Sequence, residues 1–76
     1  MEIIKAELNN EGTPVNKAVV KHNGKFYLVS ESNKFGLETL IFPSDSEGKV
    51  TDWIEVGGSR GVALHEVLAN FEGELF

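Results

Sequence analysis

The sequence predicts a small α+β domain, in which one C-terminal helix packs on an antiparallel sheet of four to five strands. Several short segments alternate apolar and polar residues, as half-buried strands do. The turns around Asn23 and Asp45 have the composition of tight hairpin turns, so consecutive strands are expected to form a meander. Near the C-terminus the apolar residues change to helical spacing. The chain of 76 residues has room for a single domain, residues 1–76.

The first two strands are expected at residues 2–8 and 15–21. In the first strand, apolar side chains alternate with charged ones, the period-two pattern of a strand with one buried face. The apolar residues of this pattern are Ile4, Ala6 and Leu8. Residues 9–14 contain Asn, Gly and Pro, which is the composition of a turn between the two strands.

The dipeptide Asn23-Gly24 predicts a two-residue hairpin turn, because both residues tolerate the positive φ values that a type I′ turn requires. A third strand at residues 26–31 should therefore return antiparallel to the strand at residues 15–21. This turn also determines which residues lie opposite each other in the hairpin. The expected pairs are Val20 with Tyr27, Ala18 with Val29, Val19 with Leu28, and Lys21 with Phe26.

Both faces of this hairpin carry apolar side chains. One small helix covers a single face, so the other face is expected to be partly exposed, wrapped by the rest of the chain, or used in self-association. A strongly coiled sheet or a partly closed barrel would instead bury parts of both faces. The surface that could receive a partner is expected to contain Val19, Lys21, Phe26 and Leu28.

A second hairpin is expected from strands at residues 37–42 and 50–56. The turn between them begins with Asp45 and ends with Gly48, and this order of residues is typical of tight turns. The acidic turn and the two apolar segments beside it therefore predict an antiparallel pair at this end of the sheet.

Trp53 is the only Trp in the chain and lies in the strand expected at residues 50–56. Its ring is expected to pack across the hairpin on Leu40 or Phe42, because a Trp side chain gains much from burying its large apolar area. The alternative is that the ring stacks on a ligand.

The last segment predicts a helix of about ten residues that docks on the sheet. Its apolar residues recur at helical spacing and so form one stripe along the helix. These residues are Leu64, Val67, Leu68 and Phe71. Gly73 is expected to end the helix. A helix of this length does not persist alone in water, so its contact with the sheet must stabilise it.

The net charge of −5 is concentrated in the second half of the chain. Residues 1–38 carry five Lys and five Glu, whereas residues 39–76 carry two basic and seven acidic residues. This balance argues against duplex nucleic acid as a partner, because such binding requires cations that neutralise phosphates.

Three lysines of the first half could still form a basic strip beside the aromatic rings of Phe26 and Tyr27. These lysines are Lys17, Lys21 and Lys25. A basic and aromatic strip is the type of surface that binds single-stranded nucleic acid. The alternative is that alternating lysines keep one face of a strand hydrated.

Residues 57–61 could form an anion-binding site. They connect the last expected strand to the helix, where free backbone N–H groups favour a negative charge. The candidate residues are Ser59, Arg60 and Gly61. The segment lacks the Gly-Lys-Ser/Thr sequence of a phosphate-binding P-loop. The alternative is a flexible connector with Ser59 near the cap of the helix.

No catalytic residue, metal site or cofactor is expected. The chain has no Cys, and its two His residues lie far apart in the sequence. His65-Glu66 lacks the second His of a zinc-binding helix, since Ala69 stands at that position. The lack of Cys fits a reducing compartment, and the sequence predicts neither a secretory leader nor a membrane-spanning run. A non-enzymatic cytoplasmic protein is therefore expected.

One block of the sequence, roughly residues 26–55, consists of FYLVS and ETLIF, an Asp-x-x-Gly turn, and KVTDWIEV. Its most distinctive part is the combination of ETxxF before the turn with TDW after it. This block resembles a pattern found in short uncharacterised proteins of bacteriophages and related mobile elements. The resemblance implies a protein made in the cytoplasm of an infected or lysogenic bacterium, and it brings no known activity and no functional residues.

Three functions follow from these observations. The first is a protein-binding module, phage-encoded if the resemblance holds, that recognises a host or viral protein through the spare sheet face or the acidic second half. The second is a ligand or single-stranded nucleic-acid binder that uses the lysine strip or residues 57–61. The third is a structural accessory protein that forms a homodimer through a free strand edge.

Overall fold

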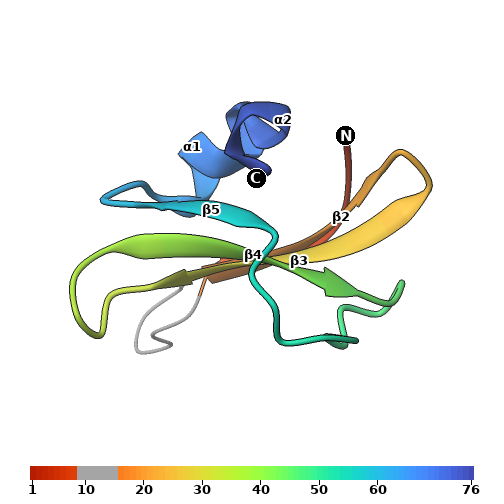
Figure 1. Ribbon diagram of the computed structural model, residues 1–76, viewed down its shortest axis with the longest axis horizontal. Helices are drawn as coiled ribbons and strands as arrows, with labels where there is room; N and C mark the ends of the chain where they lie inside the picture. The colour runs from red at the N-terminus through yellow and green to blue at the C-terminus, as the bar shows by residue number, and fades with distance from the viewer. Residues whose placement is uncertain (9–15) are drawn as a thin grey trace.

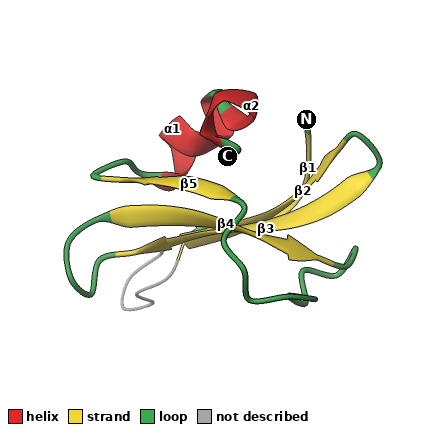
Figure 2. Cartoon of the chain, in the orientation of Figure 1, coloured by secondary structure: helices red, strands yellow, loops and turns green. Residues whose placement is uncertain are grey.

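Five antiparallel strands form one open sheet, and two short helices lie on one face of it (Figures 1 and 2). The computed structural model describes residues 1–8 and 16–76, so the turn predicted at residues 9–14 lies outside the described residues. The strands follow one another in chain order, which confirms the predicted meander and the α+β fold class. The elements are β1 (Glu2–Glu7), β2 (Asn16–His22), β3 (Lys25–Ser32), β4 (Glu38–Ser44), β5 (Gly57–Arg60), α1 (Leu64–Ala69) and α2 (Phe71–Glu74).

The β2–β3 hairpin has the register that its turn sequence predicts. Asn23 and Gly24 have φ values of 52° and 77°, as a type I′ turn requires. All four pairs expected from this turn are present in the ladder. The confirmed pairs are Val20 with Tyr27, Ala18 with Val29, Val19 with Leu28, and Lys21 with Phe26.

The helices cover one face of the sheet, which we call the helix face, and this contact forms the core. Strands β2, β3 and β4 contribute small and branched apolar residues, and the helices contribute the predicted apolar stripe. The core residues are Ala18, Val20, Val29, Ile41, Leu64, Val67 and Phe71. Each of them is almost completely buried. The predicted docking of the C-terminal helical segment on the sheet is therefore confirmed.

The helical segment forms two short helices, and the expectation of a single helix was wrong. Asn70, between α1 and α2, has φ −128° and ψ 43°, which is not helical. Asn is a poor residue for a helix interior because its side chain competes with the backbone for hydrogen bonds. The break lets Phe71 place its ring against His22 and Tyr27, with centroid distances of 5.4 and 5.6 Å. Gly73 lies within α2 and does not end the helix.

A carboxylate from the sheet satisfies the first backbone donor of α1. The N–H of Leu64 donates to Oε2 of Glu31 at 2.8 Å, and the other oxygen of Glu31 accepts from Nδ2 of Asn16, also at 2.8 Å. The negative charge of Glu31 also suits the positive end of the helix dipole. The cap position is occupied by Ala63, so the alternative that placed Ser59 near the cap was wrong.

The fifth strand is formed by residues 57–60, whereas the sequence predicted a strand at residues 50–56. In the ladder with β4, Gly57 lies opposite Ile41 and Gly58 lies opposite Leu40. Gly58 has a φ of 120°, and a Cβ atom there would overlap the carbonyl oxygen of a β4 residue. A Cβ atom at Gly57 would overlap a backbone oxygen of α2 in the same way. The two glycines therefore let this segment approach β4 and the C-terminal residues closely.

The connection between β4 and β5 lies on the other face of the sheet, which we call the loop face (Figure 1). Its first part is the predicted tight turn: the N–H of Gly48 donates to the carbonyl oxygen of Asp45 at 3.1 Å. A Cβ atom at Gly48 would lie 2.6 Å from Cγ2 of Val19, so the turn rests directly on β2. Of the three possibilities for this face, wrapping by the rest of the chain therefore occurs at Val19.

Candidate protein-binding surface

The second part of the β4–β5 connection is a protruding segment at residues 51–55, which we call the Trp53 loop. Its ends are fixed to β4 by backbone hydrogen bonds. The N–H of Thr51 donates to the carbonyl oxygen of Pro43 at 3.0 Å, and the N–H of Val56 donates to that of Ile41 at 2.8 Å. All five residues of the Trp53 loop are exposed. The segment predicted to be a strand is therefore an exposed loop held at both ends.

Trp53 and its neighbour Ile54 are unusually exposed for apolar residues of this size. The exposed fractions are 74% for Trp53 and 61% for Ile54. The indole ring touches the ring of Phe42 edge-on, with a centroid distance of 5.3 Å and an interplanar angle of 65°. The prediction that Trp53 packs on Leu40 or Phe42 is thus confirmed, but this contact leaves most of the indole accessible. Exposed apolar groups that adjoin one another are typical of interaction sites.

The Trp53 loop adjoins a partly covered apolar surface on the loop face. Opposite residues in an antiparallel ladder share a face, so Leu28 and Phe42 both lie on this side of the sheet. Both are half-buried, as is Phe26. The ring of Phe42 also contacts the indole ring of Trp53. The loop and the sheet therefore form one continuous apolar surface.

Three of the four residues expected to receive a partner reach the surface of the loop face. Phe26 and Leu28 are half-buried, and Lys21 is exposed with its ammonium 5.7 Å from the centre of the Phe26 ring. Val19 is only 3% exposed because the turn at Gly48 covers it. Val19 therefore packs beneath the turn at Gly48 and is not part of the accessible surface.

Acidic side chains border the apolar part of the Trp53 loop. Asp52 precedes Trp53, and Glu55 follows Ile54; both acidic residues are exposed. The turn beside the loop adds Asp45, whose Oδ1 accepts the N–H groups of Lys49 and Glu47 at 2.9 Å each. These backbone donors, with the N–H of Lys49 first, hold the pKa of Asp45 below its usual range. Acidic residues therefore flank Trp53 and Ile54 along the chain.

The three lysines proposed as a basic strip are divided between the two faces. Lys17 and Lys21 lie on the loop face with Val19, whereas Lys25 pairs with His22 and lies on the helix side of the ladder. The ammonium of Lys17 lies 3.5 Å from Oε2 of Glu7. The register of the hairpin thus leaves two of the three lysines on one face, and one of these two has an acidic neighbour.

The residues proposed as an anion site lie at the end of β5. Nε of Arg60 is 3.8 Å from Oε2 of Glu38, and the hydroxyl of Ser59 donates to a carboxylate oxygen of Glu74. The N–H of Gly61 donates to the carbonyl oxygen of Leu37 at 2.6 Å. Each of the three candidate residues therefore already contacts a protein oxygen. Anion binding at this position stays a prediction.

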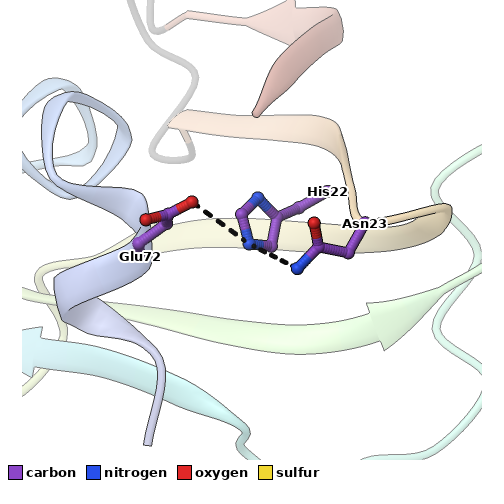
Figure 3. A network of polar contacts seen from close by, with 3 residues as sticks. All are labelled: His22, Asn23 and Glu72. Carbon is purple, nitrogen blue, oxygen red and sulfur yellow. Dashed lines mark hydrogen bonds and ion pairs between the residues drawn. The ribbon is translucent and has the colours of Figure 1, made fainter.

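A buried histidine joins α2 to the β2–β3 hairpin (Figure 3). His22 is 8% exposed, and its Nε2 lies 3.3 Å from Nδ2 of Asn23 and 3.7 Å from Oε1 of Glu72. The ring of Phe71 also packs edge-on against the imidazole. The contacts with Glu72 and Phe71 therefore join α2 to the hairpin on the helix face.

The rest of the described structure adds two observations about possible sites. Within residues 1–8 and 16–76, no group of three or more His, Asp or Glu side chains is arranged to hold a metal ion. None of the helices in that part of the chain has the length and apolar character needed to cross a membrane. No protein-family model, curated protein or solved structure matches this chain.

The Trp53 loop is the part of this surface that the sequence analysis missed. Residues 50–56 have the composition of a strand, so the exposure of Trp53 was not expected. The signal that could have revealed it is the pair Gly57-Gly58, because glycines in an extended segment often mark a close approach between backbones. With residues 57–60 assigned to the strand, the preceding segment must loop out.

Proposed function

We propose that this protein is a small non-enzymatic protein-binding module, which contacts its partner through the Trp53 loop and the adjoining loop face. The observation that carries this proposal is the exposure of Trp53 and Ile54 on a loop whose two ends are hydrogen-bonded to β4. Trp is among the residues that contribute most to protein interfaces when its ring enters an apolar pocket of the partner. The exposed indole therefore has the chemistry of an interface anchor.

The closure of the loop on β4 favours tight binding. A flexible loop loses conformational entropy when a partner orders it, and that loss reduces affinity. Here the backbone hydrogen bonds of Thr51 and Val56 already limit the loop, and Phe42 supports the indole from one side. Ordering this loop on binding therefore costs less conformational entropy than ordering a flexible loop would.

The charges around the loop define the chemistry of the partner. Asp52 and Glu55 border Trp53 and Ile54, and the second half of the chain holds all of the excess negative charge. We therefore propose a protein partner with an apolar pocket bordered by Lys or Arg side chains. If the resemblance to phage proteins is correct, this partner is a host or viral protein in the bacterial cytoplasm.

The proposal is tested by comparing two exposed aromatic residues. Wild-type protein, Trp53→Ala and the control Phe35→Ala are used to capture proteins from a bacterial lysate, and each captured protein is purified and titrated by calorimetry. Phe35 is a suitable control because it is 95% exposed but lies in the β3–β4 connection. We expect Trp53→Ala to weaken binding by about tenfold or more, since an anchor of this type contributes about 2 kcal/mol.

The affinities of the three proteins support or contradict the proposal as follows. Loss of affinity in Trp53→Ala, with normal affinity in Phe35→Ala and an unchanged circular dichroism spectrum in both, supports the proposal. A direct partner that binds all three proteins equally would contradict it, as would a partner that responds to Phe35→Ala alone. The charge requirement is tested with Asp52→Lys, which should weaken binding to a pocket bordered by basic groups.

A further inference from the structure

The two edges of the sheet differ in whether other described residues pair with them. At the β5 edge, Gly57 forms a bridge with Leu75, and the N–H of Phe76 donates to the carbonyl oxygen of Val56 at 2.9 Å. At the other edge, β1 pairs with β2 on its inner side, and no described residue pairs with its outer side. An uncovered strand edge presents unpaired backbone donors and acceptors that another strand can satisfy.

The side chains of β1 add an apolar surface to this edge. All six residues of the strand are exposed, and they include Ile3 and Ile4. Met1 and Leu8, at the two ends of the strand, are exposed as well. β1 contains no proline, so each of its residues has a backbone N–H group.

One irregularity interrupts the first half of β1. Ile3 pairs with Val20 and Lys5 pairs with the next residue of β2, so the register shifts and Ile4 is the extra residue of a bulge. From Lys5 to Glu7 the ladder is regular. The second half of the strand is therefore the part that can accept another strand without distortion.

The register of this regular part assigns its side chains to the two faces. Lys5 and Glu7 pair with residues of the loop face, whereas Ala6 pairs with Ala18 of the helix face. The period-two alternation then places Leu8 on the same side as Ala6. Each face of the edge thus has its own chemistry: a cation and an anion on one side, and apolar groups on the other.

We propose that β1 pairs antiparallel with β1 of a second copy of this chain, with the two-fold axis at Ala6. A two-fold axis perpendicular to the sheet keeps each face on its own side, so opposite residues must belong to the same face. With the axis at Ala6, Lys5 lies opposite the second copy's Glu7, and the same pair forms again across the axis. The second copy's Leu8 then lies opposite Ile4, the bulge residue next to the regular part of the ladder.

The charges select this register over its neighbours. An axis at Lys5 would place the two copies of Lys5 opposite each other, and an axis at Glu7 would do the same for the two copies of Glu7. Like charges directly opposite each other are destabilising, whereas opposite charges at these positions are favourable. The axis at Ala6 is thus the position in the regular part of β1 that forms two Lys–Glu pairs. Two five-stranded sheets then become one continuous sheet.

Charge exchange provides a test that is specific for this register. Sedimentation equilibrium of the full chain is measured over a range of concentrations for the wild type, Lys5→Glu and Glu7→Lys. We expect the wild type to dimerise and each variant to dimerise about tenfold more weakly or worse, because attraction becomes repulsion at two pairs. In a mixture of the two variants, the two carboxylates of one chain face the two ammonium groups of the other. A heterodimer should then form with near wild-type affinity.

The mixing experiment also controls for folding, because a variant that had lost its fold would not dimerise in the mixture. A wild type that stays monomeric at millimolar concentration would overturn the proposal. Variants that dimerise as well as the wild type, or variants that do not recover on mixing, would overturn it too. Trp53→Ala should dimerise like the wild type, so failure of the dimer and failure of the proposed binding surface can be told apart.

Discussion

Two rows of side chains, one residue apart along the strands, cross the same sheet on opposite faces and have different surroundings. The helix-face row is Ala18, Val29 and Ile41, and the loop-face row is Val19, Leu28 and Phe42. Every member of the first row is buried beneath the helices. In the second row only Val19 is buried, and the other two residues keep part of their surface accessible.

This difference shows that apolar composition alone does not distinguish the buried face of a sheet from a face that stays partly accessible. The two rows are similarly apolar, and they belong to the same three strands. They differ in what packs on them. Two helices pack on the helix-face row, whereas on the loop face a hydrogen-bonded turn packs on Val19. The helix face therefore buries more of its apolar surface, and the loop face keeps part of its apolar surface accessible.

The largest expected effect comes from truncating adjacent residues of β4. Ile41→Ala should lower the free energy of unfolding by about 2–5 kcal/mol, because the side chain is fully buried and its loss leaves a cavity. Phe42→Ala should lower it by less, about 1–2 kcal/mol, because Phe42 is already partly hydrated. Urea unfolding of both variants measures the difference. Equal losses would show that the loop face is as important for stability as the helix face.

A smaller effect is expected where the turn covers Val19. Gly48→Ala should cost about 2–3 kcal/mol, because the residue has a φ of 90° and the new methyl group would overlap Val19. Gly36→Ala is the matched control, since Gly36 has a φ of 102° and nothing within 4 Å of the added atom. The control should show the backbone cost alone, about 1 kcal/mol. If both variants lose the same stability, the turn does not press on β2.

The smallest effect is the pH dependence contributed by Asp45. Because its folded pKa is lowered by backbone N–H donors, the ionised carboxylate stabilises the turn at pH values above its unfolded pKa of about 3.9. This contribution should disappear as the pH falls through the lower, folded pKa. Urea unfolding of the wild type and Asp45→Asn between neutral and strongly acidic pH should show a difference at neutral pH that vanishes in acid. A difference that stays constant with pH would contradict this account of the turn.

The parts of the fold that local sequence determines could be predicted. Asn23-Gly24 sets the β2–β3 register through its own backbone preferences, so the four residue pairs and the faces of Phe26, Leu28 and Lys21 followed from it. The turn that begins at Asp45 is local in the same sense, because its hydrogen bonds join residues four or fewer positions apart.

The parts that depend on distant contacts could not be predicted in the same way. Residues 50–56 are apolar enough for a strand, but the choice of residues 57–60 depends on how closely β4 and the C-terminal residues approach the two glycines. The burial of Val19 likewise depends on a turn far along the chain. For the candidate site, the contact between Trp53 and Phe42 was foreseen, whereas the exposure of the indole required knowledge of the loop.

Glu31 has a consequence for how the molecule unfolds. Its two carboxylate oxygens bond Asn16 and Leu64, residues that lie 15 and 33 positions away in the chain. One carboxylate therefore links the start of α1 to both β2 and β3. We expect the amide hydrogens of α1 and of the central hairpin to exchange with solvent in one cooperative opening, with neither part melting separately.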